Sequence, residues 1–320
     1  MTGGLGECAS RTTAPSGALV VGSGKTYTKI QDAVDALSTT STTAQSIFIE
    51  AGTYNEQVYI PAREAKLTIY GYTEDDSSYD SNTVTITNDI YYAETENDDE
   101  TATVRNWADY STFYNVNIEN TSGASGKQAL ALSAYAEYQG YYGVQLIGWQ
   151  DTLLAQLGAQ VYAKSYIAGS VDFIFGQHAA AWFDQIDIRV QDVSYGTITA
   201  NGRPSESDAS IYVINNSTID AVSGSAVESG AYYLGRPWSE YARVVFQETS
   251  MSDVINSAGW VEWSSSDART DHVTFEEYDN SGDGSEGTRA GFSSEISSPI
   301  DVTDVLGSDY TDWVDTSYLS

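Results

Sequence analysis

Asp151 and Asp172 are the two residues whose type and spacing most clearly suggest catalysis. They stand 21 residues apart, and each comes just after a short apolar run of β-forming residues. If the two runs stack as adjacent rungs, about 4.8 Å apart, the carboxyl groups lie side by side. Two such carboxyls cannot both ionise easily, so one is pushed towards the neutral acid while the other stays an anion. The pair can then supply a proton donor and a nucleophile or base, although aspartates are also common in ordinary turns.

The strands that must position this pair repeat at the same interval. Leu146, Ile167 and Ile188 are also 21 residues apart, each within a short apolar run. A period in the low twenties, with short strands and no helical pattern between them, is typical of a parallel β-helix, in which each repeat makes one turn of a solenoid. The sequence therefore predicts an all-β solenoid that spans residues 1–320 as a single domain.

One amphipathic helix is predicted near the N-terminus, over residues 28–37. Its apolar residues recur at i, i+3, i+4 and i+7 from Ile30, which is the pattern of a helix with one buried face. Thr28 and Gln31 are expected to form a capping box at its start. Such a helix would cap the open end of the solenoid, where unpaired strand edges invite aggregation.

The remaining segments are assigned by composition. Residues 1–18 are expected to be an irregular lead-in, the acidic run at 93–101 a solvated loop, and the segment from about residue 282 a tail along the outside of the solenoid. Further strands are predicted at 46–50, 58–60, 67–70, 84–87, 113–119, 128–132, 211–214, 231–234 and 243–247.

Charge limits the partners of this chain. There are 45 acidic and 14 basic residues, for a formal net charge of −31. Nucleic acid and anionic membranes are therefore excluded as partners, because phosphate neutralisation needs lysine and arginine. Charged residues make up only 18% of the chain and apolar residues 41%, so the chain is not a disordered acidic polymer. The acidic surface suits an acidic extracellular setting, with a generic aid to solubility as the alternative.

The cysteine content and the sequons also concern the compartment. Cys8 is the one cysteine of the sequence, so disulfides do not hold the fold and no cysteine-based metal site is possible. No apolar run is long enough to cross a membrane. Glycosylation sequons at Asn120, Asn215 and Asn216 fit a secreted protein.

Short motifs occur in a fixed order along the chain. They are Gly52–Glu56 (GTYNE), Gln128–Leu132 (QALAL), Gln150–Leu153 (QDTL), Asp172–Gly176 (DFIFG), Leu234–Trp238 (LGRPW) and Gly259–Trp263 (GWVEW). In these motifs the chain resembles the pectin methylesterases, or pectinesterases, of the acidic fungal type over nearly its whole length. The resemblance implies a right-handed parallel β-helix that hydrolyses methyl esters of the galacturonate units of pectin, without cofactor or metal, as a secreted monomer.

The resemblance also implies a role for each polar residue in these motifs. Asp172 is expected to be the nucleophile and Asp151 the general acid and then base. The guanidinium of Arg236 is expected to keep Asp172 ionised, with a structural ion pair as the alternative. Gln128 and Gln150 are expected to donate amide N–H groups to the oxyanion, although many such glutamines only stack in solenoid turns.

Aromatic residues are expected to line the substrate groove. Trp238, two residues after the motif arginine, is predicted to lie against a sugar ring or the ester methyl group, with a half-buried packing role as the alternative. Trp260, Trp263, Tyr138 and Tyr142 are predicted to line the rest of the groove.

Other enzymes and binding proteins share the predicted architecture. Pectate lyases and polygalacturonases are disfavoured because the chain has no Gly-His-Gly, no Asn-Thr-Asp and no dense aspartate cluster suited to calcium near the pair. A serine esterase is excluded because no Gly-x-Ser-x-Gly elbow occurs. A sugar-binding solenoid without activity remains the third alternative. The charge of −31 should repel the newly formed polymer carboxylates, which predicts scattered rather than processive de-esterification.

Overall fold

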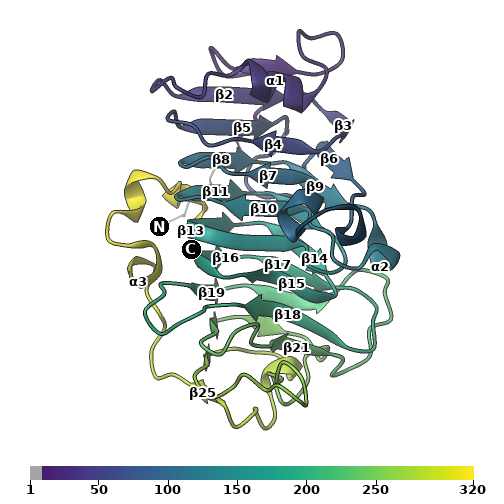
Figure 1. Ribbon diagram of the computed structural model, residues 1–320, viewed down its shortest axis with the longest axis vertical. Coiled ribbons are helices and arrows are strands. Elements are labelled where there is room, and N and C mark those ends of the chain that lie inside the picture. Colours follow the sequence, from purple (N-terminus) through teal and green to yellow (C-terminus); the bar gives the residue numbers. More distant parts are fainter. Residues whose placement is uncertain (1–8) are drawn as a thin grey trace, which may run out of the picture.

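The structure is a computed structural model that describes residues 9–320. Short strands are stacked in levels along the long axis of the molecule, from the earliest strands (purple) at one end to the latest strands (green to yellow-green) at the other (Figure 1). The predictions for residues 1–8, including that for Cys8, fall outside the described residues. The paired strands run parallel, and they form one sheet of seventeen strands and one of eight. The mostly β architecture with parallel pairing is therefore confirmed.

The larger sheet winds through all levels of the stack. Its strands are β1 (Leu19–Val21), β2 (Gln45–Ile49), β4 (Val58–Ile60), β5 (Leu67–Gly71), β7 (Val104–Asn106), β8 (Ser111–Tyr114), β10 (Leu132–Tyr135), β11 (Gln139–Tyr142), β13 (Leu153–Ala163), β15 (Val171–Gly176), β16 (His178–Asp184), β18 (Gly196–Asn201), β19 (Ile211–Asn215), β21 (Tyr232–Gly235), β22 (Arg243–Gln247), β24 (Thr274–Tyr278) and β25 (Ser293–Glu295).

The smaller sheet carries the repeat that is visible in the sequence. Leu146 pairs with Ile167, and Ile167 pairs with Ile188, so the 21-residue spacing is the true register of these rungs. Its strands are β3 (Gly52–Asn55), β6 (Val84–Asn88), β9 (Asn117–Asn120), β12 (Gln145–Ile147), β14 (Tyr166–Gly169), β17 (Asp187–Val190), β20 (Thr218–Ala221) and β23 (Ser250–Met251).

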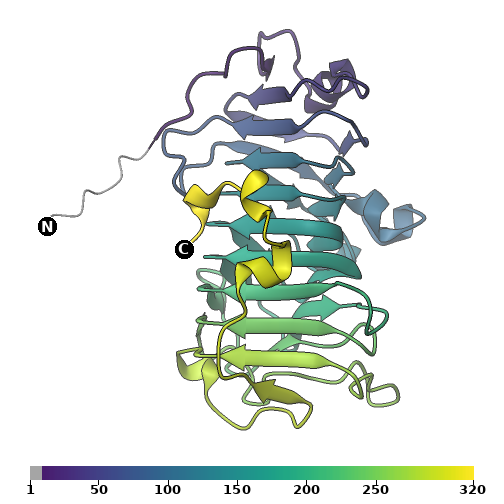
Figure 2. The ribbon, with the colours of Figure 1, turned by 90° about the vertical axis from the view of Figure 1, so that its left-hand side faces the viewer.

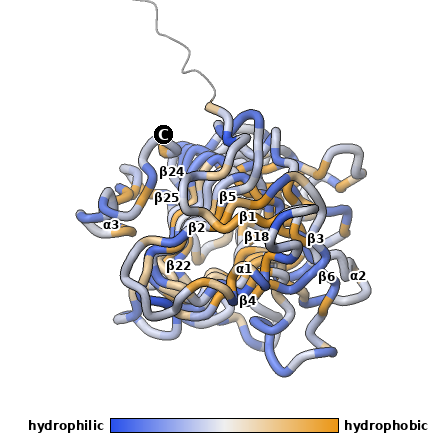
Figure 3. The backbone as a smooth tube through the Cα atoms, turned by 90° about the horizontal axis from the view of Figure 1, so that it is seen from above, coloured by the Kyte–Doolittle hydropathy of each residue, from blue (hydrophilic) through white to orange (hydrophobic). Residues whose placement is uncertain are grey.

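The interior is filled by side chains that stack from one rung to the next. Phe113, Tyr141, Tyr162 and Phe183 form a column in which successive ring centroids are 5.4, 4.9 and 4.7 Å apart and the planes are nearly parallel. These separations match the spacing of adjacent strands, so each rung adds one ring to the column. Seen from above, hydrophobic segments lie mainly towards the inside and hydrophilic loops project outward (Figure 3).

At one corner of the rungs the chain turns at a residue whose backbone has a left-handed conformation. Asn115, Lys164, Gln185 and Asn216 have φ of 53°, 48°, 55° and 45°, and each stands just before a strand of the smaller sheet. This turn divides the single strand predicted at 113–119 into β8 and β9. A residue with φ near +50° ends the extended run and redirects the chain.

Helix α1 (Ile30–Ala36) lies at the N-terminal end of the stack (Figure 1). The predicted capping box of Thr28 and Gln31 is wrong, because Lys29 is the N-cap residue and its side chain forms no capping hydrogen bond. Instead, the Glu56 carboxylate accepts hydrogen bonds from the backbone N–H groups of Ile30, at 2.8 Å, and Gln31, at 3.0 Å. A distant carboxylate thus satisfies the free N–H groups of the first turn and offsets the positive end of the helix dipole.

The acidic run at 93–101 is only in part the solvated loop that was predicted: Glu94 and Glu96 are exposed. It contains the 3₁₀ turns η1 (Tyr92–Glu94) and η2 (Asp98–Thr101), and Asp99 and Thr101 are buried. The short helix α2 (Gly123–Gly126) lies nearby in sequence, before the Gln128 motif. The error arose because a run of charges does not reveal which of its members find partners in other strands.

The C-terminal segment returns along the outside of the larger sheet (yellow in Figure 2). Val305, Leu306 and Tyr318 pack there against Tyr142 and Val161. Its short helical elements are α3 (Val302–Leu306), η4 (Tyr310–Asp312) and η5 (Thr316–Tyr318), and η3 (Asp283–Ser285) precedes them. Among the described residues, no helix has the length and apolar character that crossing a membrane requires.

Candidate active site

Asp151 and Asp172 occupy equivalent turns on adjacent rungs. Both have left-handed backbones, with φ of 61° and 51°, and the backbone N–H of Asp151 donates a 3.1 Å hydrogen bond to the carbonyl of Val171. Both residues are largely buried, at 7% and 6% exposure. The predicted side-by-side placement of the two residues on stacked rungs is what the backbone shows.

Asp172 is held by two side chains from later rungs. Arg236 donates from Nε to Oδ1 at 2.9 Å and from Nη2 to Oδ2 at 2.6 Å, so the ion pair is bidentate. Thr197, on β18, donates from Oγ1 to the same Oδ1 at 2.6 Å. These hydrogen bonds fix the orientation of the carboxylate and place a positive charge beside it, which suits a carboxylate nucleophile.

Arg236 is itself fixed by its surroundings. It directly follows β21, and its backbone N–H donates to the carbonyl of Thr199 at 3.0 Å. Its guanidinium lies over the Trp263 ring, 4.3 Å from the centroid, and Nη1 donates to the Trp263 carbonyl at 3.4 Å. Arg269 also lies over this ring, at 4.7 Å, and donates to the carbonyl of Trp238. Stacking of this kind restricts the guanidinium to one plane.

Asp151 has the opposite electrostatic environment. Burial raises the pKa of its carboxyl well above the usual range, and the carboxylates of Asp172 and Asp98 raise it further, while Arg236 opposes them. Its carboxyl forms no hydrogen bond with another described residue. Asp151 is thus favoured as the neutral acid, beside an Asp172 carboxylate that is paired with an arginine, and such a pair suits acid–base chemistry.

Gln128 and Gln150 lie on the same side of the stack as the acids. They form a parallel bridge with each other, and Gln150 forms the next one with Val171. Both are half-buried. Within residues 9–320 neither side-chain amide forms a hydrogen bond, so both are available to donate to a bound oxygen atom.

Two of the tryptophans that were predicted to line the substrate groove lie beside these polar residues. Trp238 is half-buried, with its ring centroid 5.9 Å from that of Phe175. Together with Leu154 and Ala200 these rings form a small apolar cluster. Trp263 contacts the Arg236 guanidinium, as described above, so it supports the arginine.

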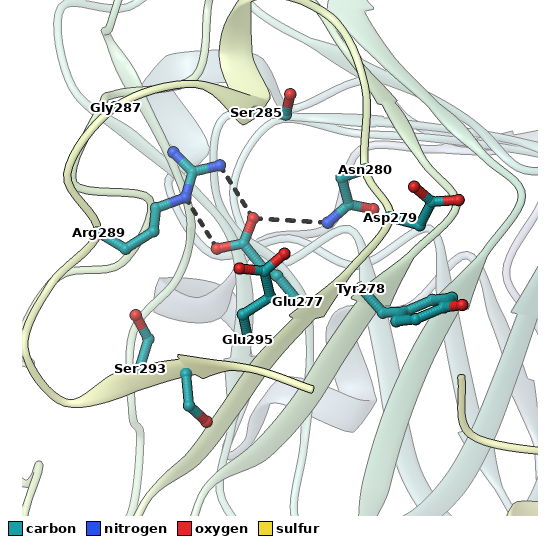
Figure 4. Close-up of a pocket in the computed structure, with 10 residues that line it drawn as sticks. Glu277, Tyr278, Asp279, Asn280, Ser285, Gly287, Arg289, Ser293 and Glu295 are labelled. Carbon is teal, nitrogen blue, oxygen red and sulfur yellow. Dashed lines mark hydrogen bonds and ion pairs between the residues drawn. The ribbon is translucent and has the colours of Figure 1, made fainter. Parts of the chain in front are cut away.

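The other three predicted groove aromatics lie elsewhere. Trp260 is 1% exposed and stacks on Phe275 at 4.3 Å within the core, so its predicted place in the groove is wrong. Its Nε1 donates to Glu277, which also forms a bidentate pair with Arg289 in a pocket lined partly by β24 and β25 (Figure 4). Trp260 is buried there because its one polar atom finds a carboxylate partner.

Tyr142 and Tyr138 contact the C-terminal segment. Tyr142 is fully buried, and its hydroxyl accepts a hydrogen bond from the backbone N–H of Asp315, so the prediction that it lines the groove is also wrong. The Tyr138 ring stacks on Tyr110 at 4.5 Å and meets Trp313 edge-on at 5.5 Å. Its predicted groove position is not supported, because these contacts hold it against the tail.

The described residues contain no group of three or more histidine, cysteine, aspartate or glutamate side chains able to hold a metal ion.

Comparison with known proteins places the chain in a family. Residues 18–295 match the Pectinesterase family, and a pectinesterase from Aspergillus niger is 62% identical over 314 residues, or 98% of this chain and 95% of that protein. The chain belongs to the pectinesterase family. It is therefore a carboxylic ester hydrolase, as the motifs predicted.

Solved structures of pectinesterases agree with this assignment. The deglycosylated pectin methylesterase from Aspergillus niger matches with a TM-score of 0.91 at 43% identity, over 97% of this chain and 100% of that one. Pectin methylesterase from carrot matches with a TM-score of 0.86 at 28% identity, over 98% of both chains. The likeness extends over the whole stack of strands.

Sequence reasoning missed two polar residues of this pectinesterase site. The Thr197 hydroxyl accepts a hydrogen bond from the backbone N–H of Asp172 and donates one to the Asp172 carboxylate. The Asp98 carboxylate is among the groups that raise the pKa of Asp151. Thr197 pairs with Val171 across adjacent strands, so the register would have identified it once β18 was known. Asp98 carries no sequence signal beyond its place in an acidic run.

Proposed function

We propose that this pectinesterase hydrolyses the methyl esters of galacturonate units in pectin, through an acyl-enzyme on Asp172. The observation that carries the proposal is the contrast between the two carboxyls: Arg236 holds both oxygens of Asp172 in a bidentate pair, while the pKa of Asp151 is raised. One carboxyl is thus prepared to attack and the other to protonate a leaving group.

The first half of the reaction forms the acyl-enzyme. An Asp172 oxygen attacks the ester carbonyl carbon, and the charge that develops on the carbonyl oxygen is stabilised by the free amide N–H groups of Gln128 and Gln150. The bond from carbon to the methoxy oxygen then breaks. Asp151 gives its proton to that oxygen, so methanol leaves and an anhydride joins Asp172 to the sugar carboxyl.

The second half restores the enzyme. Asp151, now an anion, takes a proton from water as the water oxygen attacks the galacturonate carbonyl. The anhydride bond breaks, which releases the galacturonic acid group and the Asp172 carboxylate. Asp151 is again protonated, and Arg236 again holds both oxygens of Asp172.

Substrate position is inferred from the apolar side of the cluster. Trp238 and Phe175 lie beside the carboxylates, and their rings suit the ester methyl group and a sugar face.

We also infer that the stacked rungs form a single right-handed parallel β-helix with α1 as its N-terminal cap, and that the protein acts as a secreted monomer. The acidic surface and the exposed sequon at Asn216 support secretion.

The test is methanol release from highly methylated pectin, measured for the parent, for Asp172→Asn and for Asp192→Asn. The third protein removes a carboxylate from an exposed surface position and serves as the matched control. The proposal expects release by the parent and the control, and loss in Asp172→Asn with an unchanged circular dichroism spectrum. Reducing ends or unsaturated products would instead indicate a glycosidase or a lyase, and an unaltered polymer would indicate a binding protein.

A further inference from the structure

Arg269 lies in a turn beside the active site and reaches two tryptophans. Its guanidinium lies over the Trp263 ring, 4.7 Å from the centroid, and its Nη1 donates to the backbone carbonyl of Trp238. Trp263 is also the ring over which Arg236, the partner of Asp172, lies at 4.3 Å. Trp238 is the residue proposed above to contact the sugar. Arg269 therefore contacts both the support of the proposed nucleophile and the proposed substrate surface.

The turn that carries Arg269 is closely hydrogen-bonded. The backbone N–H of Trp263 donates to the Ala268 carbonyl at 3.1 Å, and Ser264 and Asp267 exchange two backbone hydrogen bonds of 3.1 Å each. Arg269 has a left-handed backbone, with φ of 56°, and its Nε donates to Asp267 Oδ2 at 2.8 Å. The turn and the ion pair together direct the guanidinium towards the tryptophans.

The backbone of Trp238 is held on both sides. Its N–H donates to the Asn201 carbonyl at 3.0 Å, and its carbonyl accepts the hydrogen bond from Arg269. The ring lies close against Gly202, where a Cβ atom would come within 2.6 Å of Trp238 Cε3. Pro237 precedes the tryptophan and restricts the backbone there. Arg269 thus ties an already constrained tryptophan to the 263–269 turn.

These contacts form a closed ring of residues. Only Pro237 separates Arg236 from Trp238 in the chain. Arg269 binds the carbonyl of Trp238, and its guanidinium lies over the Trp263 ring. Arg236 lies over the same ring, which closes the circuit. Guanidinium groups make directional hydrogen bonds and stack in a defined plane, so loss of Arg269 frees both the Trp263 indole and the Trp238 backbone at once.

We propose that Arg269 is a positioning residue that acts through the two tryptophans. Through Trp263 it keeps the Arg236 guanidinium in the plane of the Asp172 carboxylate, and through the Trp238 carbonyl it fixes the ring that receives the sugar. The inference rests on the roles proposed above for Asp172 and Trp238. Its consequence is that one residue outside the reacting groups affects kcat and KM by two separate routes.

The test compares kcat and KM for methanol release in the parent, Arg269→Gln and Arg189→Gln, with folding checked by thermal denaturation. Arg189 is the matched control, because the two arginine side chains are 25% and 27% exposed and pair with aspartates at 2.7 and 2.8 Å. Arg269→Gln should lower kcat about fivefold and raise KM about threefold. Arg189→Gln should leave both within about 1.5-fold of the parent.

A second substitution separates positioning from a general loss of structure. In the Arg236→Lys enzyme the guanidinium that stacks on Trp263 is already absent, so adding Arg269→Gln should cause no further fall in kcat, while the rise in KM should persist. An equal fall in kcat in both backgrounds would overturn the inference, because it would show that Arg269 does not act through Arg236.

The conservative variant tests the two routes without a second substitution. Arg269→Lys keeps a donor for the Trp238 carbonyl but lacks the planar face, so it should lower kcat while leaving KM near the parental value. It also replaces Arg269→Gln if that variant unfolds. Parental kcat in either folded variant, or KM raised equally by both, would overturn the inference while leaving the esterase intact. Absence of methanol release from the parent itself would instead reject the proposed function.

Discussion

Arg236 offers the sharpest test of how Asp172, the proposed nucleophile, is held. Its guanidinium makes two charge-assisted hydrogen bonds to Asp172 and stacks on Trp263. Substitution Arg236→Lys keeps the positive charge but removes the fork and the planar face. Lysine can then approach one carboxylate oxygen as a point charge and leave the other without its donor.

The expected loss follows from these contacts. One charge-assisted hydrogen bond contributes about 1.5–3 kcal/mol, and stacking of the guanidinium on an indole ring about 0.5–1 kcal/mol. Together they amount to about 3 kcal/mol, which corresponds to roughly a 100-fold fall in kcat. KM should change little, because Arg236 contacts the enzyme's own carboxylate and not the substrate.

The assay is initial-rate methanol release over a range of pectin concentrations, with folding checked by thermal denaturation. Arg189→Lys is the matched control, because Arg189 pairs with Asp187 at 2.7 Å and Asp220 at 3.2 Å outside the site. Its kcat should stay within about twofold of the parent. A folded Arg236→Lys enzyme with a similarly small change would refute the idea that the bidentate clamp matters for catalysis.

Three further predictions concern stability and modification. The pKa of Asp151 is raised in the folded state, so its contribution to the free energy of unfolding is present at low pH and is lost as pH rises through that pKa. Asp151→Asn, which we expect to be inactive, cannot ionise there and should therefore unfold at a higher urea concentration than the parent at pH ~7. Glu56→Ala, which uncaps α1, should cost about 1 kcal/mol in the free energy of unfolding, seen in urea titration, with kcat unchanged; an unaltered midpoint would contradict the cap. In a eukaryotic secretory host, glycopeptide mass spectrometry should find a glycan at exposed Asn216 that Thr218→Ala abolishes. None should appear at Asn120, whose amide is buried and donates to three carbonyls, and a glycan there would show the description of that corner to be wrong.

The centre of the site was predictable because it repeats with the rungs. Asp151 and Asp172 follow the same beat as Leu146 and Ile167, and strand pairing converts equal spacing into adjacency. Arg236 lies 64 residues beyond Asp172, across rungs whose loops differ in length. Its position could not be derived from any period, and only the motif around it indicated a role.

The aromatic residues show where sequence reasoning stops. Trp260 and Trp263 belong to one short motif, yet Trp260 forms a bridge with Gly235 and points into the core. Trp263 lies in the following turn and reaches Arg236. The two tryptophans are only three residues apart but lie in different environments, one in the core and one beside Arg236. The motif does not show where the strand ends and the turn begins, so it could not distinguish them. Tyr142 was misplaced for a related reason, since the tail that buries it lies 173 residues further along the chain.

The distances within the site are set by backbone pairing. Gln128 bridges Gln150, Gln150 bridges Val171, Val171 pairs with Thr197, and Thr197 pairs with Tyr233. The proposed donors, acids and arginine all stand in this ladder or within a few residues of it, one rung above another. Loops at the other corners can therefore vary in length without moving the groups proposed to react, which suits a preorganised site. A shift of one residue within the ladder has the opposite effect: because side chains alternate between the two faces of a strand, it would turn a carboxylate from the site into the core.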